Sequence, residues 1–595
     1  MTVPEPLASA LATIPADPRF ELVDGWTDRG GGVWSFRFRA ALSVPASEHI
    51  DEWSGWHLVA SPCGVGFEID VFPDVEEGIK ATFPHQSYNA PPPEGVAWRT
   101  GNPCLERPTA TFRREGWSGE PADLDRRIDW YIGRLLTWID AAASDRLVEE
   151  GDPIELPVLP STIAGVTIGF WEDRAGLEWW RSAAVPWGFA SLANVPGSIG
   201  TAAIADFMDP SRASIRRPSW GPGLPVTPGQ VDAVWFVMPI LVIGAPWRLP
   251  ATWEQLTGFC SEVSVDLPGI LAQAGAQLRH IERPGRRIPS TLLMGFPMAE
   301  TKGADPERMH WLAIGNMRTA RRDDVRRGFS DRADARRQWD RALAADKRPL
   351  DYVKTANWAP DQIRRRGAAE DELRGKSVLM IGGGALGSAV AENLVRMGVT
   401  RMGIVDADVL NLGNLSRHTL SMRELGHGKA KALAAALNRM MPDANVEDVT
   451  IAFPPAKAAE RKRLEGWDVI VDCTAEDAVL RAMADYPWDG VKMFVSLSMT
   501  WRAKGLVAYA DEQASFPATD AMERFLAASA RPEEEALDLM EGIGCWHPVF
   551  PASADDVRLW AAIGTKFIRR AVVERGRLCE HFVQDDYGAI ERHVA

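Results

Sequence analysis

The sequence predicts an α/β protein of several domains, and two patterns along the chain support this fold class. From about residue 346 onwards, short apolar strands alternate with helices, which is typical of a doubly wound, mostly parallel sheet. Near the N-terminus, period-two strands are followed by a helix, which predicts an α+β unit. A chain of 595 residues is also too long for a single hydrophobic core. We therefore expect three domains, over residues 1–150, 151–345 and 346–595.

The first predicted domain contains two segments in which apolar and polar residues alternate. Apolar side chains occupy every second position in residues 34–38 and 65–71, as in strands with one buried face. Residues 128–139 instead place apolar side chains at helical spacing, after a proline-rich turn at 91–93. An antiparallel sheet with helices on one side is the expected arrangement.

The middle of the chain is read as an α+β linker domain without assigned chemistry. Apolar runs at 234–238 and 291–294 predict buried strands. The segment 318–348 mixes many arginines with aspartates, which predicts a solvated helix with internal ion pairs. Four tryptophans are predicted to lie in a core or an interdomain contact, namely Trp171, Trp179, Trp180 and Trp187.

Charge and hydropathy exclude several partners. A net charge of −15 argues against general binding to nucleic acid or to acidic membranes, because both require clustered basic surface. The longest apolar run, 233–244, is too short to span a bilayer. The N-terminal residues lack the basic and apolar regions of an export signal, so we expect a cytoplasmic protein.

Six cysteines occur, and no two have the C-x-x-C spacing of zinc or redox pairs. Disulfides are not expected in a cytoplasmic protein. Each thiol is therefore either a packing residue or a reactive group. We expect Cys63, Cys260 and Cys473 to be packing residues.

The most informative segment is the glycine turn that follows the strand at 378–381. Its glycines, Gly382, Gly384 and Gly387, turn the chain so that backbone N–H groups and a helix N-terminus face anionic oxygens. Asp406 ends the next predicted strand, where a carboxylate can accept hydrogen bonds from a ribose. These features alone would predict an NAD-binding domain.

Three later residues favour ATP over NAD. Asn414, Arg417 and Lys429 follow the second strand closely enough to reach the same crevice. A guanidinium and an ammonium suit a triphosphate whose leaving pyrophosphate must be stabilised. A hydride-transfer enzyme does not need this cluster. Either cation alone would be read as an ordinary surface residue, but the ordered set predicts nucleotide chemistry.

Residues 378–445 resemble the ThiF/MoeB-type adenylating enzymes, the family that includes ubiquitin-activating enzymes. The family's Asp–Asn–x–x–Arg–Lys set matches Asp406, Asn414, Arg417 and Lys429 one for one. The resemblance implies that ATP is used to join a protein's C-terminal glycine to AMP, and that the chain forms a homodimer.

This sequence differs from the family's usual residues at several positions. His418 stands where members usually have Gln, and Ala475-Glu476-Asp477 replaces a Thr-Asp-Asn metal site. We expect Asp477 to contact Mg²⁺, with Glu476 as the next candidate. The family's zinc-binding cysteine pairs are absent. The arginine that members contribute from a dimer mate is expected among residues 364–366.

Cys545 is the first candidate for capturing an activated acyl group. Transfer from an acyl adenylate to a thiol preserves the energy as a thioester. Glycines precede Cys545, and His547 lies close enough to influence its ionisation. From spacing alone, a packed loop cysteine is equally consistent. The family resemblance favours a reactive thiol, because activating enzymes that have a short loop in place of a separate cysteine domain carry Gly-Cys at this place.

Cys104 is the second candidate. It lies in a Gly-x-x-Cys-Leu sequence and is followed by Trp117 and a predicted helix, in the order seen in ubiquitin-conjugating enzymes. This resemblance implies that Cys104 is a conjugating thiol. The family's His-Pro-Asn motif is missing, and Asn102 or His85 is the candidate substitute as oxyanion or positioning group.

The whole order of domains resembles the activating/conjugating fusion proteins of anti-phage CBASS operons. The resemblance implies that the C-terminus of a cGAS-like nucleotidyltransferase is adenylated, captured on Cys545, passed to Cys104 and joined to an amine of a target protein. Three alternatives stay open. The chain conjugates a separate ubiquitin-like protein, or it adenylates a sulfur carrier with Cys104 inert, or it binds nucleotide without catalysis.

Overall fold

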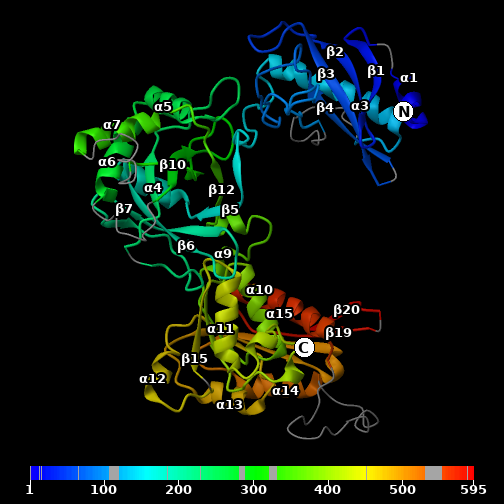
Figure 1. Cartoon of the computed structure of the whole chain (residues 1–595). Coiled ribbons are helices and arrows are strands. Elements are labelled where there is room, and N and C mark those ends of the chain that lie inside the picture. The colour runs from blue at the N-terminus through cyan, green and yellow to red at the C-terminus, as the bar shows by residue number, and fades with distance from the viewer. Residues whose placement is uncertain are drawn as a thin grey trace. The chain divides into compact units, whose positions relative to one another are not determined.

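The computed structural model, shown in Figure 1, describes most of the chain. The described residues are 2–12, 14, 17–64, 66–105, 119–183, 185–227, 229–279, 289–320, 332–450, 452–528, 552–585 and 587–594. They form two compact units. The first contains Met1–Leu192, Asp206–Arg216 and Pro228–Ala356, and the second contains Ala193–Ala205, Arg217–Thr227 and Asn357–Ala595. None of the helices among the described residues is long and apolar enough to cross a membrane.

The N-terminal part of the first unit is a four-stranded antiparallel sheet in the order β1-β2-β3-β4. Its elements are α1 (Glu5–Ala12), β1 (Phe20–Gly30), β2 (Val33–Ala41), β3 (Trp53–Cys63), β4 (Gly66–Pro73) and α3 (Leu124–Ala143). The apolar stripe of α3 packs on one face of the sheet, where the rings of Trp56 and Trp138 meet edge to face at 6.4 Å. The alternating strands and the helix predicted from residue spacing are confirmed.

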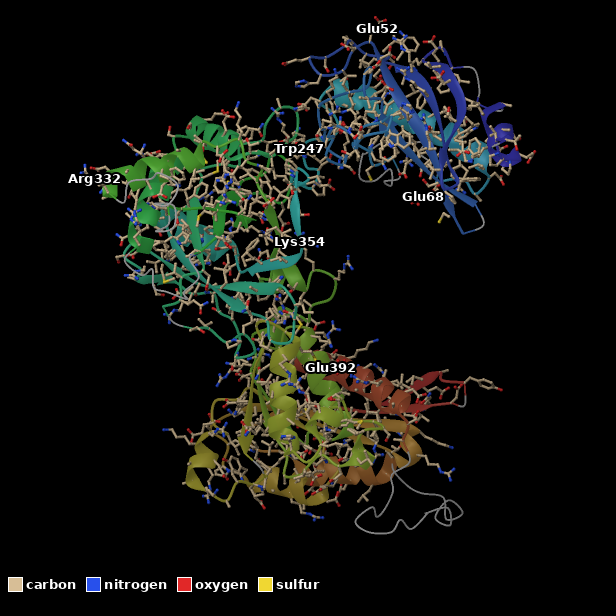
Figure 2. The ribbon with its side chains drawn as sticks, viewed as in Figure 1. Glu52, Glu68, Trp247, Arg332, Lys354 and Glu392 are labelled. Carbon is tan, nitrogen blue, oxygen red and sulfur yellow. The ribbon has the colours of Figure 1, made fainter. Side chains whose placement is uncertain are left out.

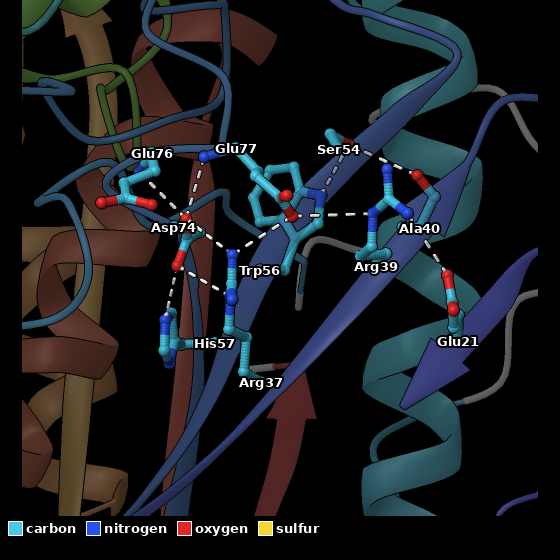
Figure 3. A network of polar contacts seen from close by, with 10 residues as sticks. All are labelled: Glu21, Arg37, Arg39, Ala40, Ser54, Trp56, His57, Asp74, Glu76 and Glu77. Carbon is cyan, nitrogen blue, oxygen red and sulfur yellow. Dashed lines mark hydrogen bonds and ion pairs between the residues drawn. The ribbon is translucent and has the colours of Figure 1, made fainter. Parts of the chain in front are cut away.

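The other face of this sheet carries a polar network (Figure 3). Arg37 and His57 are cross-strand partners on β2 and β3, and both contact the carboxylate of Asp74, at 3.1 Å and 2.9 Å. Burial lowers the pKa of His57, so its ring is neutral at pH 7. Glu77 extends the network to Arg37 and Arg39, at 3.1 Å and 3.6 Å. These contacts join β2, β3 and the segment after β4 across the polar face of the sheet.

Most of the remaining strands of the first unit belong to an eight-stranded sheet in the order β5-β12-β11-β10-β9-β6-β7-β8. The strands are β5 (Thr162–Phe170), β6 (Trp187–Asn194), β7 (Thr201–Met208), β8 (Ser214–Arg216), β9 (Ala233–Val237), β10 (Thr291–Met298), β11 (Arg308–Ile314) and β12 (Tyr352–Asn357). The helices are α4 (Arg174–Ser182), α5 (Trp253–Glu262), α6 (Leu267–Arg279) and α7 (Ala333–Ala344). β9 and β10 pair in parallel, and the strands predicted at 234–238 and 291–294 are confirmed.

The arginine-rich segment differs from its prediction as a solvated helix. Residues 321–331 lie outside the described residues, and α7 follows them. Asp340 on α7 is completely buried, with the Ala320 N–H and the Arg279 guanidinium as partners. Burial raises the pKa of Asp340 to about 6. The charge pattern did not indicate that one aspartate of the helix faces the core.

A buried carboxylate, Glu172, lies among the aromatic rings of this sheet. The indole N–H groups of Trp180 and Trp311 both donate to its Oε1, at 2.8 Å and 3.1 Å. Arg216 contacts Oε2 at 3.0 Å. Burial raises the pKa of Glu172 to about 7, although these three partners oppose the shift. Trp180 and Trp187 are buried, as predicted.

The second unit contains an eight-stranded mixed sheet in the order β15-β14-β13-β16-β17-β18-β19-β20. The strands are β13 (Val378–Ile381), β14 (Arg401–Val405), β15 (Asn445–Thr450), β16 (Val469–Asp472), β17 (Lys492–Met499), β18 (Gly505–Gln513), β19 (Leu578–Gln584) and β20 (Ile590–Val594). In the order of the sheet, the neighbouring strands β15, β14, β13, β16 and β17 pair in parallel. β18, β19 and β20 then extend the sheet with antiparallel pairing. The predicted α/β class and strand–helix alternation are therefore confirmed.

Helices cover both faces of this sheet (Figure 1). They are α8 (Pro360–Ile363), α9 (Asp371–Arg374), α10 (Ala385–Arg396), α11 (Lys429–Met440), α12 (Ala458–Lys462), α13 (Asp477–Asp485), α14 (Ala518–Ala528) and α15 (Ala554–Glu574). Val378 and Met380 of β13 point into the core beneath α10, α11 and α15, whereas Leu379 and Ile381 point into the core with α13 and α14. This burial on both faces explains why β13 reads as a continuous apolar run.

A polar contact joins α10 to α15. The carboxylate of Glu392, labelled in Figure 2, lies 3.0 Å from Arg396 and 3.2 Å from Arg558. Because α10 begins at the glycine turn, this contact supports the helix whose N-terminus faces the candidate site.

The strap Arg217–Thr227 belongs to this second unit although it lies far away in sequence. The Gly221 N–H donates to the Pro442 carbonyl at 2.8 Å, in the loop after α11. A Cβ on Gly223 would lie 1.9 Å from the Asn438 carbonyl oxygen, so only glycine allows this close approach.

We predict that Glu172→Gln removes part of the pH dependence of folding. The folded pKa near 7 exceeds the ordinary value of 4.5, so the folded state binds the proton more tightly. Stability is then fully present below pH 4.5 and falls by on the order of 3 kcal/mol as the pH rises through 7. Urea midpoints of both proteins between pH 5 and 8 measure this slope. An unchanged slope in the variant would contradict the assignment.

Candidate nucleotide site and candidate thiol sites

The glycine turn between β13 and α10 depends on two close approaches of the backbone. Gly382 has a φ of 90°, which favours glycine, and its N–H donates to the Val405 carbonyl at 2.8 Å. A Cβ on Gly387 would lie 1.9 Å from the Gly382 carbonyl oxygen. Gly384 differs, because it has a negative φ and a Cβ there would meet nothing within 4 Å. The first and last glycines shape the turn, and the middle one leaves space beside it.

A cavity of about 250 Å³ opens at the carboxyl ends of β13, β14 and β16. This is the edge at which ligands bind in open parallel sheets. Its lining residues are Ile381, Gly382, Gly384, Val405, Asp406, Ala407, Asp408, Lys429, Ala452, Phe453, Cys473, Thr474, Glu476 and Val479. The cavity thus brings together five of the site residues predicted from sequence, Gly382, Gly384, Asp406, Lys429 and Glu476.

Asp406 connects the glycine turn to the cation of the cavity. Its Oδ2 accepts the Gly383 N–H and its Oδ1 accepts the Asp408 N–H, both at 2.8 Å. Burial raises the pKa of Asp406 above its ordinary value. Asp408 then pairs with the Lys429 ammonium at 2.7 Å. Each Asp406 oxygen keeps a second acceptor position for a ribose hydroxyl.

Asn414 and Arg417 do not line the cavity. Asn414 ends the short helix η2 (Leu412–Asn414), and its Oδ1 accepts the Asn411 N–H at 3.0 Å. The Arg417 N–H donates to the Asn414 carbonyl at 3.1 Å, and Arg417 is half-buried. The sequence placed both residues near the nucleotide but did not show that η2 directs the Asn414 amide to the backbone.

From the sequence, His418 is only a departure from the family's Gln, and its structural role was not predicted. It is only 8% exposed, and its Nε2 lies 2.7 Å from the Gly383 carbonyl oxygen. Its Nδ1 accepts the Leu420 N–H at 3.1 Å. The only sequence signal was the histidine in place of the usual Gln. The structure assigns this ring a contact with the glycine turn itself.

Two acidic residues are the candidates for holding Mg²⁺ with the phosphates of a nucleotide. Glu476 lines the cavity, whereas Asp477 begins α13 and lies 3.9 Å from Arg481. In the described ranges, no group of three His, Cys, Asp or Glu side chains is arranged as a complete metal site. One or two carboxylates nevertheless fit Mg²⁺, which takes its other ligands from phosphates and water.

Arg364 is not available to a dimer partner, so its candidacy for that role is wrong. It is buried and bonds both oxygens of Asp443, at 2.6 Å and 2.8 Å. Its other donors reach the carbonyls of Val395 and Arg396. Arg365 and Arg366 are exposed. Arg364 therefore holds the end of α10 in place. The sequence around Arg364 did not indicate this structural role.

Cys104 is exposed and lines a cavity of about 370 Å³ in the first unit. Its N–H donates to the His85 carbonyl at 2.8 Å, and the Ser87 N–H donates to the Asn102 carbonyl at 2.9 Å. The buried side chain of Gln86 joins these two segments, because it bonds the Phe83 N–H and the Gly101 carbonyl. The loop that carries the thiol is thus fixed by the backbone and by one buried amide.

Asn102 and Asp70 lie beside Cys104 in the same cavity. The Asn102 Nδ2 donates to the Asp70 Oδ1 at 2.7 Å. Because an ionised carboxylate only accepts, this contact fixes which way the amide points. Asn102 keeps one further N–H, and Asp70, on β4, was not found from the sequence.

The remaining cysteines differ in their surroundings. Cys63 is exposed at the end of β3, so its prediction as a packing residue is wrong. Cys260 is buried, and burial raises the pKa of its thiol to about 12. Cys473 packs against the core of the second unit. Cys545 and Trp117 lie outside the described residues.

Comparisons with known proteins agree on two regions of the chain. Residues 145–358 match the family described as the Cap2 central linker domain, and residues 359–524 match the ThiF family. An ATP-dependent ubiquitin transferase-like protein Cap2 from Enterobacter hormaechei subsp. hoffmannii (strain UCI 50) is 44% identical over 591 residues. That match covers 99% of this chain and 98% of that protein.

Other similarities are shorter. The adenylyltransferase and sulfurtransferase MOCS3 of Mus musculus is 38% identical over 104 residues, which cover 17% of this chain and 22% of that protein. The structure of E. coli MccB with ATP covers 38% of this chain and 64% of that chain, at 13% identity and a TM-score of 0.27.

We predict different effects for two glycine variants of the turn. Gly387→Ala places a Cβ against the Gly382 carbonyl, so it lowers the free energy of unfolding by about 1–3 kcal/mol and weakens ATP binding. Gly384→Ala leaves stability within about 1 kcal/mol but weakens ATP binding, because its Cβ points into open space at the cavity. Thermal unfolding and ATP titration measure both. A Gly387→Ala protein of wild-type stability would contradict the close approach of Gly387 to the Gly382 carbonyl.

Proposed function

Because the chain belongs to the Cap2 family of ATP-dependent ubiquitin transferase-like proteins, we propose that it uses ATP to join the C-terminal glycine of a protein partner to an amine of a target protein. The similarity over 98% of the relative's length is the observation that carries this proposal. The cavity lined by the glycine turn, Asp406 and Lys429 supports it, because it offers N–H groups and a cation to phosphates.

The first step is adenylation. The partner's terminal carboxylate attacks the α-phosphorus of ATP, the bond to the pyrophosphate breaks, and an acyl adenylate forms. The Gly382 and Gly383 N–H groups are already bound to Val405 and Asp406, so the N–H groups at the start of α10, from Gly384 onwards, contact the phosphates. Asp477 or Glu476 would hold Mg²⁺, which neutralises part of the phosphate charge.

Lys429 stabilises the leaving pyrophosphate. Its side chain is largely buried, while its partner Asp408 is 71% exposed. An exposed carboxylate competes weakly with a triphosphate, so the Lys429 ammonium transfers from Asp408 to the phosphates when ATP binds. Arg417 acts with it from the segment after η2, as the family resemblance implies.

The next steps use the two thiols. The Cys545 thiolate attacks the acyl adenylate, AMP leaves, and a thioester forms. The Cys104 thiolate then takes the acyl group and releases Cys545. Finally a target amine attacks the Cys104 thioester, a C–N bond forms and the thiolate leaves. The free N–H of Asn102, oriented by Asp70, donates to the carbonyl oxygen as negative charge develops there.

The setting of this reaction is also part of the proposal. The partner is a cGAS-like nucleotidyltransferase in anti-phage defence, and the enzyme acts as a cytoplasmic homodimer. A separate ubiquitin-like protein is the alternative partner. Carrying both thiols on one chain raises their effective concentration, so transfer needs no second encounter.

The similarity to MOCS3 favours a second candidate function, adenylation of a sulfur carrier. The matched residues form only 17% of this chain, whereas Cys104 and its ordered loop belong to the N-terminal part, which is built on a separate sheet. Adenylation of a sulfur carrier does not require the Cys104 thiol. A Cys104→Ala protein that forms the same products as wild type would therefore favour this second function.

We predict that Lys429→Ala lowers ATP–pyrophosphate exchange by at least roughly 100-fold, because a group that stabilises the transition state is lost. Arg417→Ala is expected to act in the same direction. Lys431→Ala is the matched control, since Lys431 is exposed two residues further along α11. Exchange is measured with candidate partners that have or lack the terminal glycine. Exchange that ignores that glycine would disprove partner adenylation.

We predict two thiol-sensitive adducts on non-reducing gels with ATP, Mg²⁺ and the partner. Cys545→Ala abolishes both adducts, whereas Cys104→Ala keeps the adduct on Cys545 and loses conjugation to the target. Cys63→Ala is the control, because Cys63 is the other exposed cysteine of the N-terminal sheet domain among the described residues. A Cys104→Ala protein that still conjugates its target would refute the proposed order of transfer.

A further inference from the structure

The imidazole of His418 uses both of its nitrogens to hold backbone groups. A carbonyl oxygen only accepts, so Nε2 must carry the proton that is donated to Gly383 at 2.7 Å. A backbone N–H only donates, so Nδ1 must be the unprotonated nitrogen that accepts from Leu420 at 3.1 Å. The neutral ring with its proton on Nε2 is the one form that satisfies both contacts.

The Gly383 peptide is held from two sides. Its N–H donates to Asp406 and its carbonyl oxygen accepts from His418. Asp406 continues through the Asp408 N–H to the ion pair with Lys429. His418 therefore ends a chain of contacts that fixes both the glycine turn and the cation of the cavity.

The charges near the ring also favour its neutral form. Burial lowers the pKa of His418, the hydrogen bond to Gly383 opposes this shift, and the Lys429 ammonium at the start of α11 lowers the pKa further. On the α10 side, the neighbouring contact is uncharged, from the Thr419 N–H to the Ser388 hydroxyl at 3.4 Å. Asp406 lies on the other side of the Gly383 peptide. Arg417 is adjacent in the chain.

We propose that His418 is a positioning residue that holds the glycine turn ready for ATP, and that nucleotide binding requires its neutral ring. Protonation would turn Nδ1 into a donor that faces the Leu420 N–H, so that contact would be lost and the ring displaced. Nε2 would still donate to Gly383, but the ring would no longer be fixed from the Leu420 side, so it would hold the turn less firmly. This inference rests on the proposed adenylation function for its biological meaning.

The acid side of the pH profile is the signature of this role. The ordinary pKa of histidine is about 6.5, and the pKa of His418 lies below it. ATP binding is therefore constant at neutral pH and weakens as the pH falls through that lowered pKa. A glutamine at this position offers an N–H to Gly383 but does not titrate.

The test compares three variants by titration with ATP between pH 5 and 8. His418→Ala is expected to weaken ATP binding roughly tenfold or more, because the Gly383 carbonyl loses its buried donor. His418→Gln is expected to retain binding within about threefold of wild type, without the acid limb. His427→Ala is the matched control, because His427 is an exposed histidine nearby whose ring contacts only the Glu424 carbonyl in the described structure.

Several outcomes would overturn the inference. His418→Ala that binds ATP as wild type does would show that the ring does not position the turn. An acid limb that persists in His418→Gln would assign the titration to another group, and this arm decides the matter even where the alanine variant fails to fold. Wild-type protein that binds ATP but shows no partner-dependent exchange would remove the proposed function and leave the inference standing on the binding data.

Discussion

The close approach of Gly387 to the Gly382 carbonyl is the constraint on which the candidate nucleotide site depends. It lets α10 begin directly at the turn, with its first N–H groups at the cavity. Asp406 and His418 then hold the peptide between, and Asp408 brings Lys429 to the same place. Because each contact relies on the one before it, the surface that faces the phosphates is ordered before any nucleotide arrives.

The loop of Cys104 reaches a similar order by different means. In the part of this loop that the structure describes, no helix begins; two short segments pair through their backbones, and the buried amide of Gln86 joins them. Asp70 orients Asn102 from a neighbouring strand. A thiol in an exposed but fixed loop is accessible to a large partner and still holds a defined geometry, which transfer between two proteins requires.

Much of the second unit was predictable because its signals are local. The apolar strand before the turn, the glycines and Asp406 lie close together in sequence, and carboxyl ends of adjacent parallel strands must meet at one edge. Contacts between distant residues were not predictable. The pairs Asn102–Asp70 and Arg364–Asp443 join separate elements, and the direction of the Asn414 amide depends on a single short turn. Spacing indicates which residues share a region but not where their side chains point.

The strap Arg217–Thr227 has a consequence for how this architecture can be recombined. Gly223 lies against the carbonyl of Asn438, in the last turn of α11, and Gly221 lies against the carbonyl of Ala444, in the loop that follows. A swap of the second unit between two homologous proteins at residue 345 would therefore separate the strap from the backbone that it packs against. A chimera that exchanges residues 217–227 together with residues 357–595 would keep both close backbone approaches intact.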